Sequence, residues 1–73
     1  MNILVVGGAG REHAIAYSLS KSPLTKKLVV APGNPGIETF AECSPIAADD
    51  IDRQCELAKH IKADFVFIGP EIP

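Results

Sequence analysis

The chain begins with an apolar strand that leads directly into a glycine-rich turn and then into a helix. Residues 1–6 (MNILVV) are almost all apolar, which is typical of a strand covered on both faces of a parallel sheet. The turn reads Gly7-Gly8-Ala9-Gly10, and its glycines allow a sharp change of backbone direction. The first N–H groups of a helix lack intrahelical acceptors and lie at the positive end of its dipole. The sequence therefore predicts an anion-binding turn, of the kind that most often holds a phosphate.

Strands and helices alternate along the rest of the chain. Residues 11–21 have a helical pattern with one small, apolar face, and Pro23 ends it because the residue before a proline is driven out of helical geometry. Residues 27–31 and 65–68 are two more apolar runs and are expected to be buried strands. A second helix is expected from residue 51 to about residue 62. This order predicts an α/β fold with an open parallel sheet.

The second helix has the clearer amphipathic pattern. Asp49 or Asp50 is its expected N-cap, because an aspartate side chain accepts hydrogen bonds from the first turn of a helix. The stripe predicted for its buried face consists of Ile51, Cys55, Ala58 and Ile61. Before this helix, residues 43–47 are expected to be a short extended stretch, and Pro45 restricts it to a sheet edge or to no strand at all.

Length and composition indicate an incomplete domain. A chain of 73 residues is at most one small domain and buries only about 60% of its unfolded surface. Its hydrophobic fraction of 47% is high for this size, so we expect other parts of a longer protein to cover some of its surface. The last apolar run lacks the following helix that normally covers such a sheet. We therefore expect residues 1–73 to be the first part of a longer N-terminal domain.

Charge and cysteine spacing exclude several classes of function. The formal net charge of −2 offers no electrostatic attraction to nucleic acid. No apolar stretch is long enough to span a membrane, and the start does not resemble a signal peptide. Cys43 and Cys55 are too far apart for a CxxC motif and have no clustered histidines. We expect two reduced thiols in a cytoplasmic protein and no metal site.

The glycine turn does not match the common nucleotide-binding motifs. In the G-x-G-x-x-G/A motif of dinucleotide sites, the register from Gly7 fails at Ala9, and the register from Gly8 fails at His13. The second strand ends in Ala31-Pro32-Gly33, without the acidic residue that binds the ribose of NAD and without an arginine for NADP. No Gly-Lys-Ser/Thr sequence closes the turn as in nucleotide hydrolases. The class of ligand that still fits the glycine turn is a smaller phosphorylated molecule.

Three unusual loops follow the three strands. They are the glycine turn, the sequence PGNPG at residues 32–36, and GPEIP at residues 69–73. Right-handed crossovers bring the carboxyl ends of parallel strands to one edge of the sheet, where ligands of such folds bind. The sequence therefore predicts that the three loops converge on one ligand site.

Several side chains in these loops are candidates for ligand contacts, each with a structural alternative. Arg11 either adds positive charge at a phosphate held by the backbone N–H groups from Gly8 to Arg11, or is a solvated residue of the first helical turn. Asn34 either bonds a sugar hydroxyl or simply tolerates a turn. Glu71, between two prolines, is suited to sugar hydroxyls or an amine.

Two neighbouring residues of the first helix are weaker candidates. Glu12 either contacts a ligand or only favours the helix N-terminus through the dipole. His13 either donates to a phosphate or packs within the protein. The structural alternative is the simpler one for both residues.

The three loops together resemble one enzyme family. The sequences GGAGREHA from Gly7, APGNPG from Ala31 and GPEIP from Gly69 are similar to the start of the phosphoribosylamine–glycine ligases, also called glycinamide ribonucleotide synthetases. The resemblance covers residues 2–73. Each motif is weak alone, but the three in this order and at this spacing are specific.

The resemblance implies a Rossmann-like first domain and an ATP-dependent ligase that joins glycine to 5-phosphoribosylamine in purine biosynthesis. ATP and Mg²⁺ or Mn²⁺ would be bound by a later ATP-grasp domain, outside this chain, so these residues alone are expected to be inactive and to hold no catalytic residue. Carried over, the resemblance places Gly8, Gly10 and Arg11 at the phosphate and Glu71 at the ribose or the amine. Pro32, Gly33 and Asn34 would form a wall of the site.

Two alternatives remain open. The chain could be the first domain of another ATP-grasp enzyme, such as a carboxylase or a formate-dependent transformylase. It could also be a nucleotide-binding module without catalysis. The residues that follow Pro73 in a longer protein would separate the purine ligase from another enzyme of the superfamily, and the absence of any ATP-grasp pattern there would exclude both.

Overall fold

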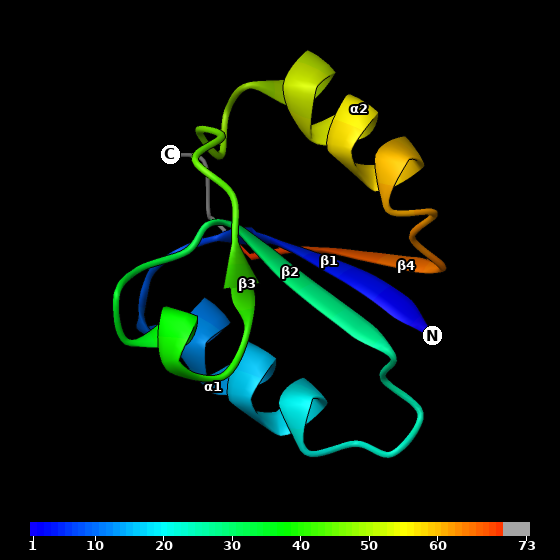
Figure 1. Ribbon diagram of the computed structural model, residues 1–73. Coiled ribbons are helices and arrows are strands. Elements are labelled where there is room, and N and C mark those ends of the chain that lie inside the picture. The colour runs from blue at the N-terminus through cyan, green and yellow to red at the C-terminus, as the bar shows by residue number, and fades with distance from the viewer. Residues whose placement is uncertain (70–73) are drawn as a thin grey trace.

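The computed structural model describes residues 1–69 and contains one four-stranded parallel sheet between two helices (Figure 1). The elements are β1 (Asn2–Gly7), α1 (Gly10–Ser20), β2 (Lys27–Pro32), the short 3-10 helix η1 (Ile37–Thr39), β3 (Glu42–Cys43), α2 (Ile51–His60) and β4 (Phe65–Ile68). The strand order is β3-β2-β1-β4, and every pair is parallel. The fold is thus α/β and Rossmann-like, as predicted.

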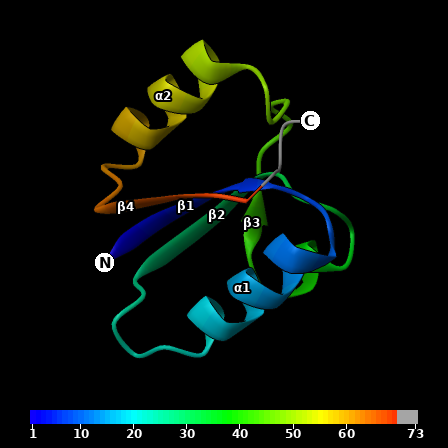
Figure 2. The ribbon, with the colours of Figure 1, turned by 180° about the vertical axis from the view of Figure 1, so that it is seen from behind.

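The two helices cover opposite faces of the sheet, which is clear from both sides of the molecule (Figure 2). Alternate residues of β1 and β2 point to the two faces, and each face has its own buried cluster. The cluster on the α1 face consists of Ile3, Val5, Ala16, Leu28, Val30 and Ile37. The cluster on the α2 face consists of Leu4, Val6, Val29, Ala31, Ile46 and Ile61. Burial on both faces explains why β1 and β2 are continuous apolar runs.

β1 lies inside the sheet, and later strands are added on both of its sides: β2 and β3 on one side and β4 on the other. From β1 the chain passes through α1 to β2 on one side, and from β3 it passes through α2 to β4 on the other side. The carboxyl ends of β1 and β4 therefore flank a topological switch point, where open α/β sheets bind their ligands. The predicted convergence of the strand ends on one edge is confirmed for the described residues.

Local signals placed most element boundaries to within one or two residues. α1 begins at Gly10, one residue before the expected start, and α2 ends at His60. Asp50 is the N-cap of α2, since its carboxylate accepts a hydrogen bond from the Arg53 N–H at 3.3 Å. The extended stretch near Pro45 is reduced to the two-residue strand β3 at the sheet edge.

The predicted buried stripe of α2 was partly wrong. Ile61 is buried, but Ile51 is 68% exposed, Cys55 is exposed, and Gln54 is buried instead. The Gln54 side-chain Nε2 donates to the carbonyls of Ala31 (3.1 Å), Ile46 (3.2 Å) and Ala47 (3.1 Å). These carbonyls lie at the end of β2 and in the loop before α2, and buried carbonyls need a donor. The buried face of α2 therefore includes the polar Gln54 instead of the predicted Ile51 and Cys55.

The buried face of α1 contains a charged residue. Glu12 and Ala16 are buried and stand one turn apart, while Ala14 is exposed. Leu19 packs beside the cluster on this face. A buried carboxylate in the first turn of a helix is not visible to an apolar pattern, so the burial of Glu12 was not expected.

Residues 65–68 form the predicted strand β4, but the described residues do not bury its side chains. The four side chains of β4 are between 42% and 70% exposed. β4 is an edge strand that pairs only with β1 among the described strands. Apolar composition indicates what a strand can bury, but here no described element covers the outer side of β4.

Ile37 and Ile51 provide a matched test of this core. Replacing the fully buried Ile37 by alanine should lower the free energy of unfolding by about 2–5 kcal/mol, because a cavity remains in the α1-face cluster. The same change at Ile51, which is 68% exposed, should alter it by less than about 0.5 kcal/mol. Urea unfolding followed by circular dichroism measures both. Equal losses in the two variants would contradict this assignment of the core.

Candidate functional site

The loops after β1 and β2 are joined by hydrogen bonds. The Gly33 N–H donates to the Gly7 carbonyl at 3.0 Å. The Asn34 side-chain Nδ2 donates to the Gly8 carbonyl at 2.8 Å, and its Oδ1 accepts from the Ile37 N–H at 2.9 Å. Asn34 thus connects the glycine turn, its own loop and η1. The loops form one unit at the carboxyl edge of the sheet, and the Asn34 amide serves to hold them together.

Close approach of the two backbones explains the glycines. A Cβ atom at Gly8 would collide with the Gly33 carbonyl oxygen. Gly7 and Gly33 have φ values of +131° and +72°, a region that residues with side chains rarely adopt. A Cβ at Gly33 would also collide with the Cys43 side chain. These glycines are therefore required by the packing of the loops, whether or not a ligand is bound.

Glu12 lies at the switch point between β1 and β4. Its side chain is 3% exposed and occupies the space where Cβ atoms of Gly7 and Gly69 would lie. The Gly69 N–H donates to the Val6 carbonyl at 3.1 Å, so the end of β4 is held against β1 at the same place. Glu12 is in the first turn of α1, where a carboxylate is favoured by the helix dipole. The Glu12 side chain therefore fills the space between Gly7 at the end of β1 and Gly69 after β4.

The start of α1 is exposed at this edge. Ala9 is the N-cap and makes no side-chain hydrogen bond to the helix. Gly10 and Arg11 are exposed, and a Cβ at Gly10 would meet no atom within 4 Å. The N–H groups of a first helical turn point out of the helix end. This opening can accept an anion next to the rigid loops.

The predicted site residues occupy two neighbouring regions. Gly8, Gly10 and Arg11 are at the turn and the start of α1. Pro32 is the exposed last residue of β2, and Gly33 and Asn34 follow it, half-buried. The structure brings these two groups together through the Gly8–Asn34 bond. Glu71 lies outside the described residues.

His13 packs within the protein. Its ring meets Phe40 edge-on, with 5.4 Å between the ring centroids, and Tyr17 contacts the same phenylalanine. The His13 ring also lies close to Gly36, where a Cβ would approach it to 3.0 Å. The packing alternative is the one that the structure supports for this residue.

The two cysteines and the possible metal ligands are further candidates for reactive groups. Burial raises the pKa of the Cys43 thiol, so the reactive thiolate is disfavoured there. Cys55 is exposed on α2. Within residues 1–69, no three histidine, cysteine or acidic side chains are grouped to hold a metal ion. No helix in that range is long and apolar enough to cross a membrane.

Gly8 and Gly10 provide a matched test of the joined loops. Gly8→Ala should lower the free energy of unfolding by about 1–3 kcal/mol, because the new methyl group displaces the loop after β2. Gly10→Ala should leave stability unchanged or raise it by up to about 1 kcal/mol, since the site is open and helical. Thermal and urea unfolding measure both. An equally stable Gly8→Ala variant would show that the loops are not held in contact.

The family of the chain follows from comparison with known proteins. A family model described as "Phosphoribosylglycinamide synthetase, N domain" matches residues 1–73. Similar proteins from Caulobacter vibrioides and Caldanaerobacter subterraneus are 52% and 48% identical over 71 and 73 residues, and both are named phosphoribosylamine–glycine ligase. The matches cover 97% and 100% of this chain but 17% and 18% of the relatives, so the chain spans less than a fifth of their length. The resemblance found in the three loops is confirmed, and the chain belongs to the phosphoribosylglycinamide synthetase N-domain family.

Proposed function

We propose that this chain forms the phosphoribosyl side of the substrate site in an ATP-dependent ligase that joins glycine to 5-phosphoribosylamine during purine biosynthesis. The names of the relatives support the reaction. The single observation that supports the site is the hydrogen-bonded pair of loops beside the open start of α1, at the switch point of the sheet.

The phosphate is proposed to bind at the start of α1. Backbone N–H groups of Gly8 and Gly10 are donors of the kind that a phosphate prefers at a helix N-terminus. Arg11 adds a guanidinium, which can donate two parallel hydrogen bonds to phosphate oxygens. Because the joined loops already hold the turn in place, little ordering is required when the ligand binds.

The ribose and its amine are proposed to lie between the loops after β2 and β4. Pro32, Gly33 and Asn34 form one wall, which the Asn34–Gly8 and Gly33–Gly7 bonds hold in position. Asn34 therefore has a positioning role, since its amide already bonds the protein. Glu71 follows the end of β4 and is proposed to meet the ribose hydroxyls or the amine.

The remaining parts of the reaction are assigned to the rest of the same polypeptide. ATP, Mg²⁺ or Mn²⁺ and glycine are proposed to bind there, in an ATP-grasp domain and later regions of a cytoplasmic enzyme. Within residues 1–69, no group of three histidine, cysteine or acidic side chains could hold a metal ion. This chain contributes by positioning a substrate amine for attack, which is a large part of catalysis in reactions between two bound molecules. Alone, it is proposed to have no ligase activity.

Ligand titration tests the proposed substrate class. A longer protein that contains these residues should bind glycinamide ribonucleotide, which carries the same phosphoribosyl group, and should not bind NAD. Arg11→Ala should weaken the ribonucleotide by at least about tenfold, because charge-assisted hydrogen bonds contribute about 1.5–3 kcal/mol. Lys21→Ala, on the C-terminal side of α1, is the control and should bind like the unmodified protein. Isothermal titration calorimetry measures the binding of the ribonucleotide to the unmodified protein and to both variants, and of NAD to the unmodified protein. Binding of NAD without the ribonucleotide would overturn the proposal.

Glu71 has a separate kinetic test. In the complete enzyme, Glu71→Ala should raise the KM for 5-phosphoribosylamine, because a contact to the ribose or the amine is lost. Glu56→Ala removes an exposed carboxylate from α2 and should leave the kinetics unchanged. Steady-state assays with saturating ATP and glycine give both values. Equal KM values for the two variants would reject the role of Glu71.

A further inference from the structure

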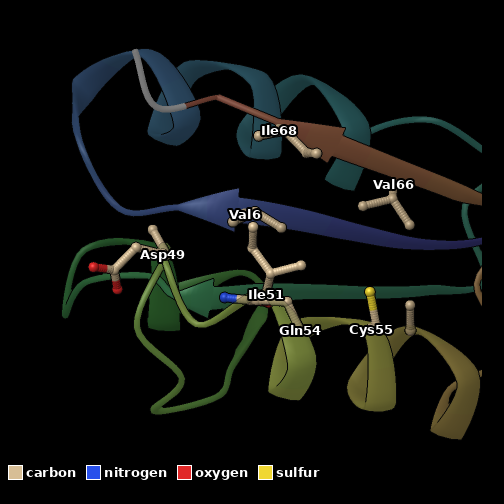
Figure 3. A pocket seen from close by; sticks show the side chains of 9 residues that line it. Val6, Asp49, Ile51, Gln54, Cys55, Val66 and Ile68 are labelled. Atoms are coloured by element: carbon tan, nitrogen blue, oxygen red, sulfur yellow. The ribbon is translucent and has the colours of Figure 1, made fainter. Parts of the chain in front are cut away.

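Two polar side chains are buried in the part of the chain that the structure describes, and they differ in what satisfies them. Gln54 is 6% exposed and lines a cavity of about 330 Å³ together with Val6 (Figure 3). Its Nε2 donates to three backbone carbonyls, as described above. Glu12 is 3% exposed and belongs to the first turn of α1, which covers the other face of the sheet. Because Glu12 carries a charge, its burial requires the stronger compensation.

The Glu12 carboxylate finds no donor in the described protein. Within residues 1–69 it makes no hydrogen bond and no ion pair. In the same range, the one fully enclosed side-chain oxygen or nitrogen without a partner is Oε1 of Gln54. The Glu12 oxygens are therefore not sealed inside the protein, although the rest of the side chain is covered. A buried carboxylate in this situation is expected to meet a donor from outside the fold.

Glycines at two strand ends hold this carboxylate in place. Its Oε1 lies against Gly7, and its Oε2 is 3.1 Å from the position that a Cβ atom at Gly69 would occupy. The Gly69 N–H donates to the Val6 carbonyl at 3.1 Å, which fixes the second of these positions against β1. The carboxylate thus lies at the switch point of the sheet, where ligands of such folds bind. Because the acceptor is held before a ligand arrives, little ordering is required on binding.

The position of Glu12 also restricts how a phosphorylated ligand can lie. Glu12 directly follows Gly10 and Arg11, where the phosphate is proposed to bind. Two negative charges repel more strongly where protein excludes water between them. The anionic end of the ligand is therefore expected at the start of α1, and a group that donates hydrogen bonds is expected at Glu12.

We propose that Glu12 determines which group is accepted at C1 of the phosphoribosyl ligand, by accepting a hydrogen bond from a nitrogen attached there. This inference rests on the proposed function, since it assumes that a phosphoribosyl group occupies this edge of the sheet. An N–H group satisfies the carboxylate, whereas a diphosphate on the same carbon is repelled by it. The site accepts 5-phosphoribosylamine and rejects 5-phosphoribosyl diphosphate, although both molecules carry the same ribose and 5-phosphate.

Two ligands that differ at C1 test this role. A longer protein that contains these residues is titrated with glycinamide ribonucleotide, which has an amide N–H on C1, and with 5-phosphoribosyl diphosphate. The unmodified protein should bind the ribonucleotide at least about 100-fold more tightly, because a like charge in the site costs several kcal/mol. Glu12→Gln keeps the shape of the side chain and removes its charge. It should weaken the ribonucleotide about tenfold and bind the diphosphate more tightly than the unmodified protein does.

The ratio of the two dissociation constants separates this role from a structural one. If Glu12 only supported the fold, Glu12→Gln would weaken both ligands equally, because they share the ribose and the 5-phosphate. Glu56→Gln removes an exposed carboxylate from α2, so it is the matched control and should leave the ratio unchanged. Equal weakening of both ligands by Glu12→Gln, or a ratio like that of the control, would overturn the role of Glu12.

A second variant covers the case in which Glu12→Gln does not fold, as judged by circular dichroism. Glu12→Asp keeps the charge but withdraws the carboxylate by one methylene group. It should weaken the ribonucleotide and still exclude the diphosphate, and unchanged ribonucleotide binding would contradict the contact.

The unmodified protein distinguishes the failure of this inference from the failure of the proposed function. A protein that binds both ligands equally well contradicts the role of Glu12 but retains the phosphoribosyl site. A protein that binds neither ligand contradicts the proposed function and the inference together.

Discussion

Burial of β1 on both faces, with a paired strand on each edge, is the constraint on which the rest of the structure depends. Leu4 and Val5 are fully buried on opposite faces, and β1 pairs with β2 on one side and β4 on the other. A strand with this environment must be apolar throughout, and it must be covered by helices above and below. The positions of α1 and α2 follow from this requirement. The glycine turn then lies where β1 ends, at the middle of the carboxyl edge.

The glycine turn is shaped by its neighbours as much as by any ligand. Gly8 contacts the Gly33 carbonyl, and Gly7 leaves space for the buried Glu12 side chain. Asn34 and Gly33 bond the turn from the side of β2. The exposed start of α1 remains as the open part of the edge. A hydrogen-bonded pair of loops beside an exposed helix start is well suited to hold a phosphorylated molecule, because the loops are joined before it binds.

The sequence predicted the main elements because each has a strong local signal. Apolar runs marked β1 and β2, and the pair Asp49–Asp50 marked the start of α2, which Asp50 caps. Predictions of burial were weaker for α2 and β4. Gln54 faces the sheet because backbone carbonyls need its amide, and β4 is exposed because it is the last strand of the described sheet. Neither fact can be read from local composition, since both depend on what lies nearby in space.

The sequence by itself determined the fold class, the family and the three loops that follow the strands, because periodicity, turn residues and motif spacing are local properties of the chain. Only the tertiary structure decided that Asn34 joins two loops, that Glu12 packs between the ends of β1 and β4, and that His13 contacts Phe40. The physical reason is that these contacts join segments brought together by the sheet. Hydrogen bonding and burial then select among the roles that each residue type allows.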